Sequence, residues 1–271
     1  MPALLATVCL ACLACLACLA SGCGAGANPA VVVVGSSSVQ PYAEILAEEY
    51  AHIYPDCEID VQGGGSSAGI MAAQTGIAEI GMSSRALKSG ERDLWSVEIA
   101  KDGLALITHP KNPVLNLTME QARGIYAGAI ANWSEVGGLD AKIHVISREE
   151  GSGSRGAFED LVMDKTPITT KAIIQDSNGA VRQLVSNDIN AIGFISMGLA
   201  DKTVRALSLD GAAATCENVK NGGYALYRPF LFVSNGEPDG NTMHFITYVL
   251  SEEGQRLLAD EGLITINYDK K

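Results

Sequence analysis

Short apolar runs alternate with amphipathic segments along most of the chain. Val31–Val34 is a run of four β-branched residues, which indicates a buried parallel strand. Pro41 then opens an amphipathic helix, with Ile45, Leu46 and Tyr50 on one side. The same alternation predicts strands at 59–61, 79–82, 104–108, 143–147, 191–195 and 224–233, and helices around 70–71 and at 118–126, 178–185, 241–250 and 252–260. This pattern predicts an α/β protein with mostly parallel sheets that helices cover on both faces.

The strand at 104–108 ends at His109-Pro110, where the composition changes to Pro, Asn and Lys. We interpret this change as a crossing from one lobe to a second α/β unit, and the strand at 224–233 as the return crossing. The predicted first lobe therefore comprises 28–107 plus 230–271, and the second lobe comprises 108–229. Two crossing strands would form the hinge between the lobes.

The first 22 residues are not expected to belong to the folded protein. The chain is almost wholly apolar from Ala3 to Ala20, and the small residues Ala20-Ser21-Gly22 stand directly before Cys23. This arrangement indicates a signal peptide at 1–22 and resembles a bacterial lipobox, so cleavage would leave Cys23 as a lipidated N-terminus. A short transmembrane anchor is the alternative interpretation.

Composition and charge narrow the possible partners. The 271 residues carry a net charge of −12, which argues against nucleic acid or an anionic membrane surface as the main partner. Membrane contact is expected through the lipid anchor only. Outside the leader and Cys23, the remaining cysteines are Cys57 and Cys216, which could form a disulfide, although we expect free thiols. The four histidines are isolated and no Cys/His pattern has metal-ligand spacing, so neither a metal nor a cofactor is expected.

Four loops share one design, in which a predicted strand is followed by a Gly/Ser turn or a short polar turn. They are Gly35-Ser36-Ser37-Ser38, Gly65-Ser66-Ser67, Ser83-Ser84-Arg85 and Arg148-Glu149-Glu150-Gly151-Ser152-Gly153-Ser154. Turns that follow parallel strands gather at one edge of the sheet, where ligands bind. A helix start offers free backbone N–H groups and the positive end of a dipole, which suits an anion. Each serine taken alone could equally be a helix N-cap, but the four loops together favour an anion site.

Arg148 strengthens that interpretation, because a guanidinium on a Gly/Ser loop matches the geometry of an oxyanion. We expect Glu150 to orient it. The alternative for Arg148 is a surface ion pair with Glu149 or Glu150.

Other chemistries have less support. The chain does not contain the Gly-x-x-x-x-Gly-Lys-Ser/Thr loop of nucleotide sites, and Gly-x-Ser-x-Gly does not occur as the nucleophile elbow of a serine hydrolase. An exported phosphatase or esterase that uses a loop serine stays possible only if folding brings a histidine close. An adhesin or signalling lipoprotein that has lost its ligand is a further alternative, against which the retained hydroxyls argue.

Taken in order, the loop motifs resemble the phosphate-binding protein family of the phosphate ABC transporter, which is a family of periplasmic solute-binding proteins. The resemblance covers essentially all of the chain after Cys23. It rests on Gly35-Ser-Ser-Ser-Val-Gln-Pro41, Gln62-Gly-Gly-Gly-Ser-Ser-Ala-Gly69, Ile80-Gly-Met-Ser-Ser-Arg85, Asn132-Trp133, Ser147-Arg-Glu-Glu-Gly-Ser-Gly-Ser-Arg155, Ser177-Asn-Gly-Ala180 and Ser251-Glu-Glu-Gly-Gln255.

The resemblance implies a two-lobed periplasmic-binding-protein fold with phosphate dehydrated in the cleft, and it implies binding without catalysis. Carried over loop by loop, it assigns the ligand contacts to Ser37, Ser38 (partly through its backbone N–H), Ser66, Ser84, Arg148, Ser152, Gly153 and Ser154. Most of these groups are neutral dipoles, which explains how an acidic protein could hold an anion.

Ser84 stands where members of the family carry an aspartate that accepts the proton of phosphate. A receptor for another tetrahedral oxyanion, such as sulfate or molybdate, is therefore the alternative ligand class. For Arg85 we favour a salt bridge on the lobe surface over a side chain that turns toward the ligand. The predicted function is extracytoplasmic capture of inorganic phosphate by a protein anchored to the cell membrane. The implied partners are the permease subunits of an ABC uptake transporter.

Overall fold

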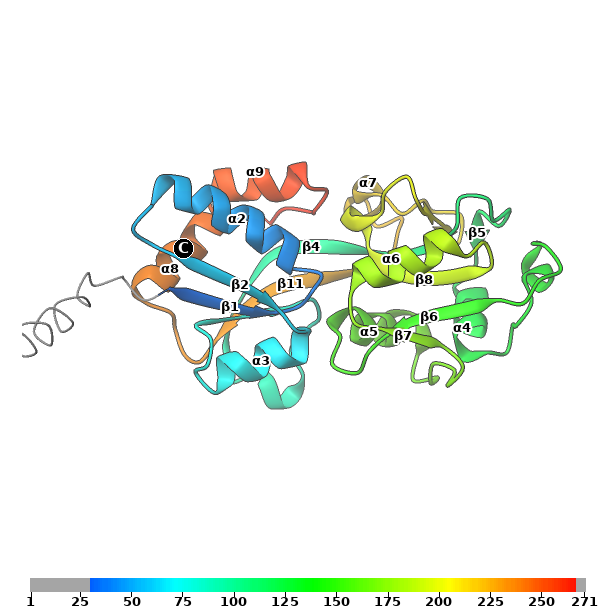
Figure 1. The fold of residues 1–271 in the computed structure, drawn as a ribbon, viewed down its shortest axis with the longest axis horizontal. Coiled ribbons are helices and arrows are strands. Elements are labelled where there is room, and N and C mark those ends of the chain that lie inside the picture. Colours follow the sequence, from blue (N-terminus) through cyan, green and yellow to red (C-terminus); the bar gives the residue numbers. More distant parts are fainter. Residues whose placement is uncertain (1–29, 267–271) are drawn as a thin grey trace, which may run out of the picture.

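The computed structural model describes residues 30–266. The chain forms two α/β lobes, and two long strands run between them (Figure 1). The signal segment and Cys23, predicted from the sequence, lie outside the described residues. Within the described part, no helix is both long enough and apolar enough to cross a membrane.

The first lobe contains the N-terminal strands and the C-terminal helices of the described chain, which lie side by side in Figure 1. Its strands are β1 (Val31–Gly35), β2 (Ile59–Gly63) and β3 (Ile80–Ser83), and its helices are α2 (Gln40–Ile53), α3 (Ser66–Gln74), α8 (Gly240–Val249) and α9 (Glu252–Asp260). The three strands are parallel, and β1 is the middle one. The apolar runs seen in the sequence therefore became the central strands of this lobe.

The second lobe is built in the same way from the middle of the chain. Its strands are β5 (Asn116–Leu117), β6 (His144–Arg148), β7 (Ile173–Gln175), β8 (Ala191–Ser196), β9 (Arg205–Ala206) and β10 (Ser208–Leu209), and its helices are α4 (Met119–Ala127), α5 (Gly153–Phe158), α6 (Asn178–Asn187) and α7 (Cys216–Lys220). β6 lies between β7 and β8 and is parallel to both.

The crossing strands β4 (Trp95–Thr108) and β11 (Tyr227–Ser234) join the two parallel sets into one sheet. The strand order is β2-β1-β3-β11-β4-β8-β6-β7, with β9 paired to β4. β11 runs antiparallel to both β3 and β4, and β4 runs antiparallel to β8. The hinge is thus two adjacent antiparallel strands, which confirms the two-lobed fold that the sequence predicted.

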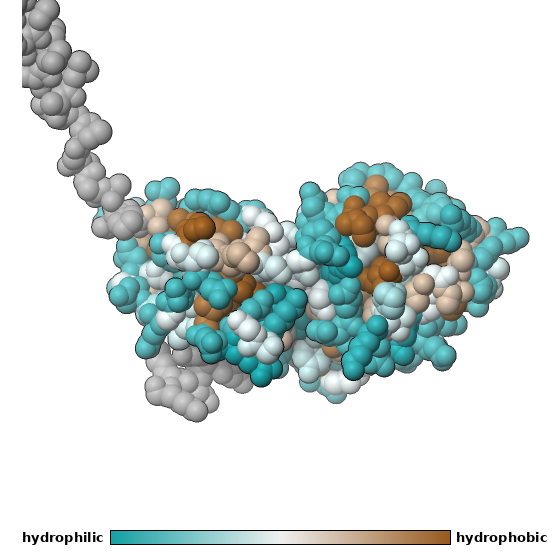
Figure 2. Space-filling model, turned by 90° about the horizontal axis from the view of Figure 1, so that it is seen from below, coloured by the Kyte–Doolittle hydropathy of each residue, from teal (hydrophilic) through white to brown (hydrophobic). Residues whose placement is uncertain are grey.

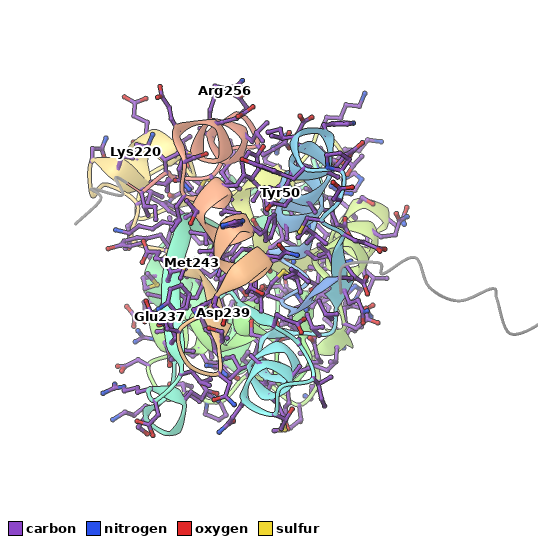
Figure 3. The ribbon with its side chains drawn as sticks, turned by 90° about the vertical axis from the view of Figure 1, so that its left-hand side faces the viewer. Tyr50, Lys220, Glu237, Asp239, Met243 and Arg256 are labelled. Atoms are coloured by element: carbon purple, nitrogen blue, oxygen red, sulfur yellow. The ribbon has the colours of Figure 1, made fainter. Side chains whose placement is uncertain are left out.

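The core divides where these strands cross. Ala100 and Phe230 belong to the core of the first lobe, whereas Leu104 and Leu226 belong to that of the second. The lobe boundaries predicted at 107/108 and 229/230 stay predictions, and the change of core lies within β4 and β11. In the first lobe, Tyr50 of α2 (Figure 3) packs against α8, and the centroid of its ring is 5.3 Å from that of Phe245.

The face shown in Figure 2 is mostly hydrophilic, and the molecule narrows between the lobes. Cys57 and Cys216 are both free thiols, as expected. Cys57 is packed in the core of the first lobe. Cys216 begins α7 in the second lobe, and its thiol donates to the carbonyl of Gly262.

Candidate functional site

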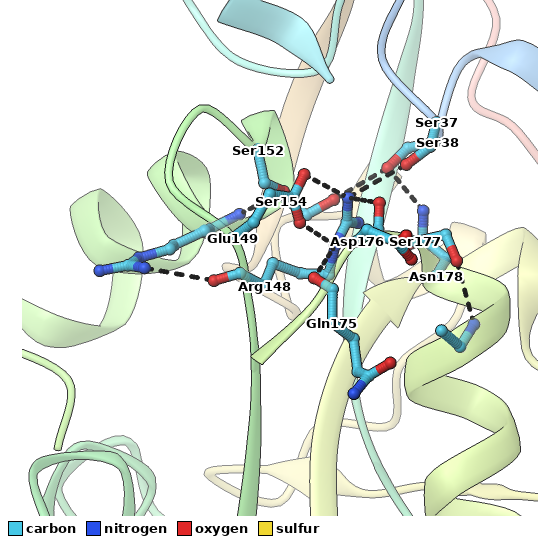
Figure 4. A network of polar contacts seen from close by, with 12 residues as sticks. Ser37, Ser38, Arg148, Glu149, Ser152, Ser154, Gln175, Asp176, Ser177 and Asn178 are labelled. Carbon is cyan, nitrogen blue, oxygen red and sulfur yellow. Dashed lines mark hydrogen bonds and ion pairs between the residues drawn. The ribbon is translucent and has the colours of Figure 1, made fainter. Parts of the chain in front are cut away.

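The site lies where the two lobes face each other. The loops after β1 and β3 come from the first lobe, and the loop after β6 comes from the second lobe. The structure brings most of the residues assigned from the sequence into one network of polar contacts, part of which Figure 4 shows.

The serines of the first lobe form a buried chain of hydroxyls. Ser36 Oγ donates to Ser84 Oγ at 2.8 Å, and the backbone N–H of Ser84 donates to Ser66 Oγ at 3.0 Å. The hydroxyls of Ser66 and Ser84 are 3.3 Å apart. Ser36 also accepts the backbone N–H of Ser38, which the family resemblance assigns to the anion. Because these serine hydroxyls hydrogen-bond to one another, the direction of each remaining hydrogen-bond donor and acceptor is defined.

Three hydrogen bonds between side chains of the site join the two lobes. Ser38 Oγ and Ser154 Oγ are 2.8 Å apart, and Asn178 Nδ2 donates to the same Ser38 hydroxyl at 2.9 Å. Arg148 Nη2 donates to Ser37 Oγ at 3.1 Å. Ser37 and Ser38 thus contact side chains of the second lobe directly.

Arg148 is the cation of this network and is only 1% exposed. Its Nε and Nη2 donate to the two carboxylate oxygens of Glu149 at 2.9 and 3.0 Å. The same guanidinium donates to the carbonyls of Gln175 and Asp176. Its Nη1 is buried and has no hydrogen-bond partner among residues 30–266. Since a buried N–H without a partner is costly, this nitrogen is suited to an additional acceptor.

The prediction that Glu150 pairs with Arg148 was wrong, because the carboxylate of Glu149 forms the ion pair with Arg148 instead. The backbone N–H of Glu149 donates to the carbonyl of Gln175 on the neighbouring strand β7, which keeps Glu149 beside the end of β6. Glu150 is exposed in the turn that follows. The alternative prediction was a surface ion pair of Arg148 with Glu149 or Glu150. Arg148 does pair with Glu149, but it is buried and does not lie at the surface.

The start of α5 lies tightly against serines of the first lobe. Ser152 is its N-cap, and the Ser152 hydroxyl accepts the backbone N–H of Arg155 at 3.3 Å. A Cβ atom at Gly153 would collide with the hydroxyls of Ser66 and Ser84. Only glycine therefore allows the first turn of α5 to meet the serines of the opposite lobe.

Arg85 makes the expected salt bridge, but in a buried position. Its Nη1 and Nη2 donate to the two carboxylate oxygens of Glu91 at 2.7 and 2.9 Å, and the residue is 4% exposed. The hydrogen bond from Arg85, helped by the backbone N–H of Lys88, holds the pKa of Glu91 below its usual value. Arg85 is therefore committed to its own lobe.

The sequence analysis did not single out Ser36 or Asn178 as site residues. Asn178 stands within the Ser177-Asn178-Gly179-Ala180 motif, at the start of a predicted helix. The structure shows that it links the end of β8 to the loop after β1, because its Oδ1 accepts the backbone N–H of Ser196 while its Nδ2 donates to Ser38. Across the part of the chain that the structure describes, no group of three or more His, Cys, Asp or Glu side chains is placed to hold a metal ion.

A family model for a PBP superfamily domain matches residues 23–253. The phosphate-binding protein PstS of Bacillus subtilis is 30% identical over 246 residues, which cover 89% of this chain and 82% of that protein. The chain belongs to the PstS family of the PBP superfamily.

Solved structures support the same family. A putative phosphate ABC transporter substrate-binding protein from Clostridium perfringens, with bound phosphate, is 46% identical and superposes with a TM-score of 0.86. The match covers 88% of this chain and 100% of that one. An ABC-type phosphate transport receptor from Vibrio cholerae is 38% identical with a TM-score of 0.74, and the match covers 88% of this chain and 100% of the receptor. The fold predicted from the sequence is therefore that of the PstS family.

Proposed function

We propose that this protein binds inorganic phosphate between its lobes and delivers it to an ABC uptake transporter. One observation carries the proposal: hydroxyls from both lobes converge with a buried arginine that has a spare N–H donor. Such neutral donors and a charge-compensated guanidinium can replace the hydration shell of an anion. The phosphate in the related Clostridium perfringens structure supports the same ligand.

We assign the phosphate contacts to the set expected from the sequence, which is Ser37, Ser38, Ser66, Ser84, Arg148, Ser152, Gly153 and Ser154, and we add Asn178. The charge of Arg148 is compensated by Glu149. The anion is then bound by local dipoles in a protein whose net charge is −12. This arrangement requires no basic surface.

Isothermal titration of the protein lacking residues 1–22 tests the proposal. We expect binding of phosphate well below the millimolar range, which is the weak end of the affinity scale. Matched titrations with sulfate and molybdate decide the ligand class. Loss of all phosphate binding in the folded protein would refute the proposal.

The second candidate is a receptor for another tetrahedral oxyanion, and Ser84 is the observation that favours it. A hydroxyl at this position lacks the charge with which a carboxylate would repel a fully ionised anion. An affinity for sulfate equal to or above that for phosphate would establish this candidate.

The hydrolase alternative gains no support from the contacts of the cleft. Ser38 contacts Ser154 and Asn178, while the imidazole of His144 pairs with Asp188 at 2.6 Å. A chromogenic phosphate ester provides the test: turnover that disappears in Ser38→Ala would favour an enzyme.

We also propose that the protein is exported and tethered to the cell membrane through Cys23. The support is the apolar leader that ends in Ala-Ser-Gly before this cysteine. In cells fed a labelled fatty acid, the wild-type protein should incorporate label and partition with membranes. A Cys23→Ala variant that is still labelled would contradict the assignment.

A further inference from the structure

A second buried arginine lies at the hinge. Arg228 on β11 pairs in register with Asp102 on β4, at the point where both strands pass from one core to the other. Ser196 on β8 is in register with Leu104, two residues further along β4. Because register partners share a face and strand residues alternate, Arg228, Asp102 and Ser196 lie on the same face of the three strands.

The carboxylate of this group is fully occupied. Arg228 Nε and Nη2 both donate to Asp102 Oδ2, at 3.0 and 2.9 Å. Ser196 Oγ donates to Asp102 Oδ1 at 2.7 Å. Asp102 is 0% exposed and Arg228 is 2% exposed. Asp102 therefore compensates the charge of Arg228 through Nε and Nη2. Its two oxygens already accept three hydrogen bonds, so it has little room to accept one from Nη1.

The other edge of Arg228 has no partner within the described chain. Its Nη1 is buried without a hydrogen bond, as is Nη1 of Arg148. Burial lowers the pKa of Arg228, Asp102 opposes that effect, and the positive charge of Arg148 lowers the pKa further. The two guanidinium groups are thus within electrostatic reach of each other. Each guanidinium is paired with a carboxylate, but each keeps one buried N–H group that a shared anion could satisfy.

A short chain of hydrogen bonds connects the hinge group to the cleft. Ser196, whose hydroxyl donates to Asp102, gives its backbone N–H to Asn178 Oδ1 at 3.2 Å. Asn178 in turn donates to Ser38, which contacts Ser154 of the opposite lobe. Two residues, Ser196 and Asn178, therefore connect the hinge pair to Ser38 in the cleft.

We propose that Arg228 is a second guanidinium of the oxyanion site, which donates through Nη1 to the anion from the hinge side. Asp102 holds the guanidinium in place and compensates its charge, just as Glu149 does for Arg148. This inference rests on the proposed function, since it assigns one more binding residue to the same site. It also gives the hinge a direct contact with the ligand, so the anion would be bound by both lobes and by the strands between them.

The test is phosphate titration of the double variant Asp102→Asn/Arg228→Gln, in the protein lacking residues 1–22. Replacing a whole buried ion pair with neutral groups of similar volume is often tolerated, whereas removing one partner is not. We expect the double variant to fold and to bind phosphate roughly 10- to 100-fold more weakly, because one charge-assisted hydrogen bond is lost. Ser196→Ala is the matched control, since it removes a donor to Asp102 and leaves Arg228 intact. Its affinity should stay within about threefold of wild type, which is less than the loss of a single neutral hydrogen bond.

The outcomes are distinguishable. Wild-type protein that binds neither phosphate nor sulfate refutes the proposed function itself. Wild-type binding with an unchanged double variant overturns only the role of Arg228, and so does a Ser196→Ala variant that loses as much affinity as the double variant. If the double variant does not fold, Arg228→Lys decides. A folded lysine variant with at least roughly tenfold weaker binding supports the inference, and one with native affinity overturns it.

Discussion

Replacement of Gly153 by alanine is expected to prevent full closure of the lobes. The added Cβ would stand against the hydroxyls of Ser66 and Ser84, which belong to the opposite lobe. Both serines are buried and held by Ser36 and by the backbone of their own loops, so they have little room to move. The variant places one methyl group at this tight contact between the lobes.

The cost can be estimated from overpacking. Forcing an extra methyl group into a well-packed contact costs about 1–3 kcal/mol. Because the clash is between lobes, opening of the cleft relieves it and the penalty falls on the closed, ligand-bound state. Phosphate affinity should therefore drop roughly 5- to 150-fold. The melting temperature without phosphate should change little, since alanine is at least as good as glycine in a helix.

The assay is titration calorimetry with phosphate, combined with thermal melting with and without the ligand. Gly179→Ala is the matched control, because this glycine also lies in the first turn of a helix and a Cβ there would meet nothing within 4 Å. It should bind as wild type does. A Gly153→Ala protein with native affinity would refute the steric argument, as would one that melts much earlier without phosphate.

Three further predictions concern charged and polar groups. Arg148→Ala should weaken phosphate binding roughly 100-fold or more, because several charge-assisted hydrogen bonds are lost. Arg85→Ala should change the phosphate affinity less than about threefold and should instead lower the melting temperature. Equal losses of affinity would show that Arg85 also contacts the ligand. Since the pKa of Glu91 is lowered in the folded state, its contribution to stability is present above its ordinary pKa and is lost as the pH falls through the folded value. The stability advantage of wild type over Glu91→Gln should therefore shrink in denaturant titrations as the pH falls below the ordinary pKa of a glutamate, and a constant difference would contradict the pairing. Ser84→Asp should raise the ratio of phosphate to sulfate affinity by roughly tenfold or more in competition titrations, and an unchanged ratio would place Ser84 away from the protonated oxygen.

Most of the fold could be predicted from local pattern. Val31–Val34 and the apolar run at 191–195 became central strands, because β-branched and aliphatic runs bury well in a parallel sheet. The strand predicted at 104–108 is in fact the second half of β4, which begins at Trp95. The part of β4 before residue 104 includes Ser96, Glu98 and Asp102 and so lacks an apolar run. These polar residues interrupt the apolar pattern, so the pattern predicted only the last part of the strand.

The candidate site was predicted as a set of loops. The convergence of Ser38, Ser66 and Ser154 followed from the rule that turns after parallel strands share one sheet edge. The partners within the site could not be predicted in the same way. Whether Glu149 or Glu150 pairs with Arg148 depends on the conformation of the turn after β6. Both glutamates are so close to Arg148 in the sequence that either carboxylate could reach it.

The sequence by itself determined the α/β class, the two lobes and the loop chemistry of an oxyanion site, because each depends on residues close together in the chain. Only the tertiary structure decided that Gly153 must be glycine, that Asn178 joins Ser38 to β8, and that Arg228 meets Asp102 across the hinge. The last pair is 126 residues apart in sequence. Such contacts arise from strand register and lobe closure, which no local pattern encodes.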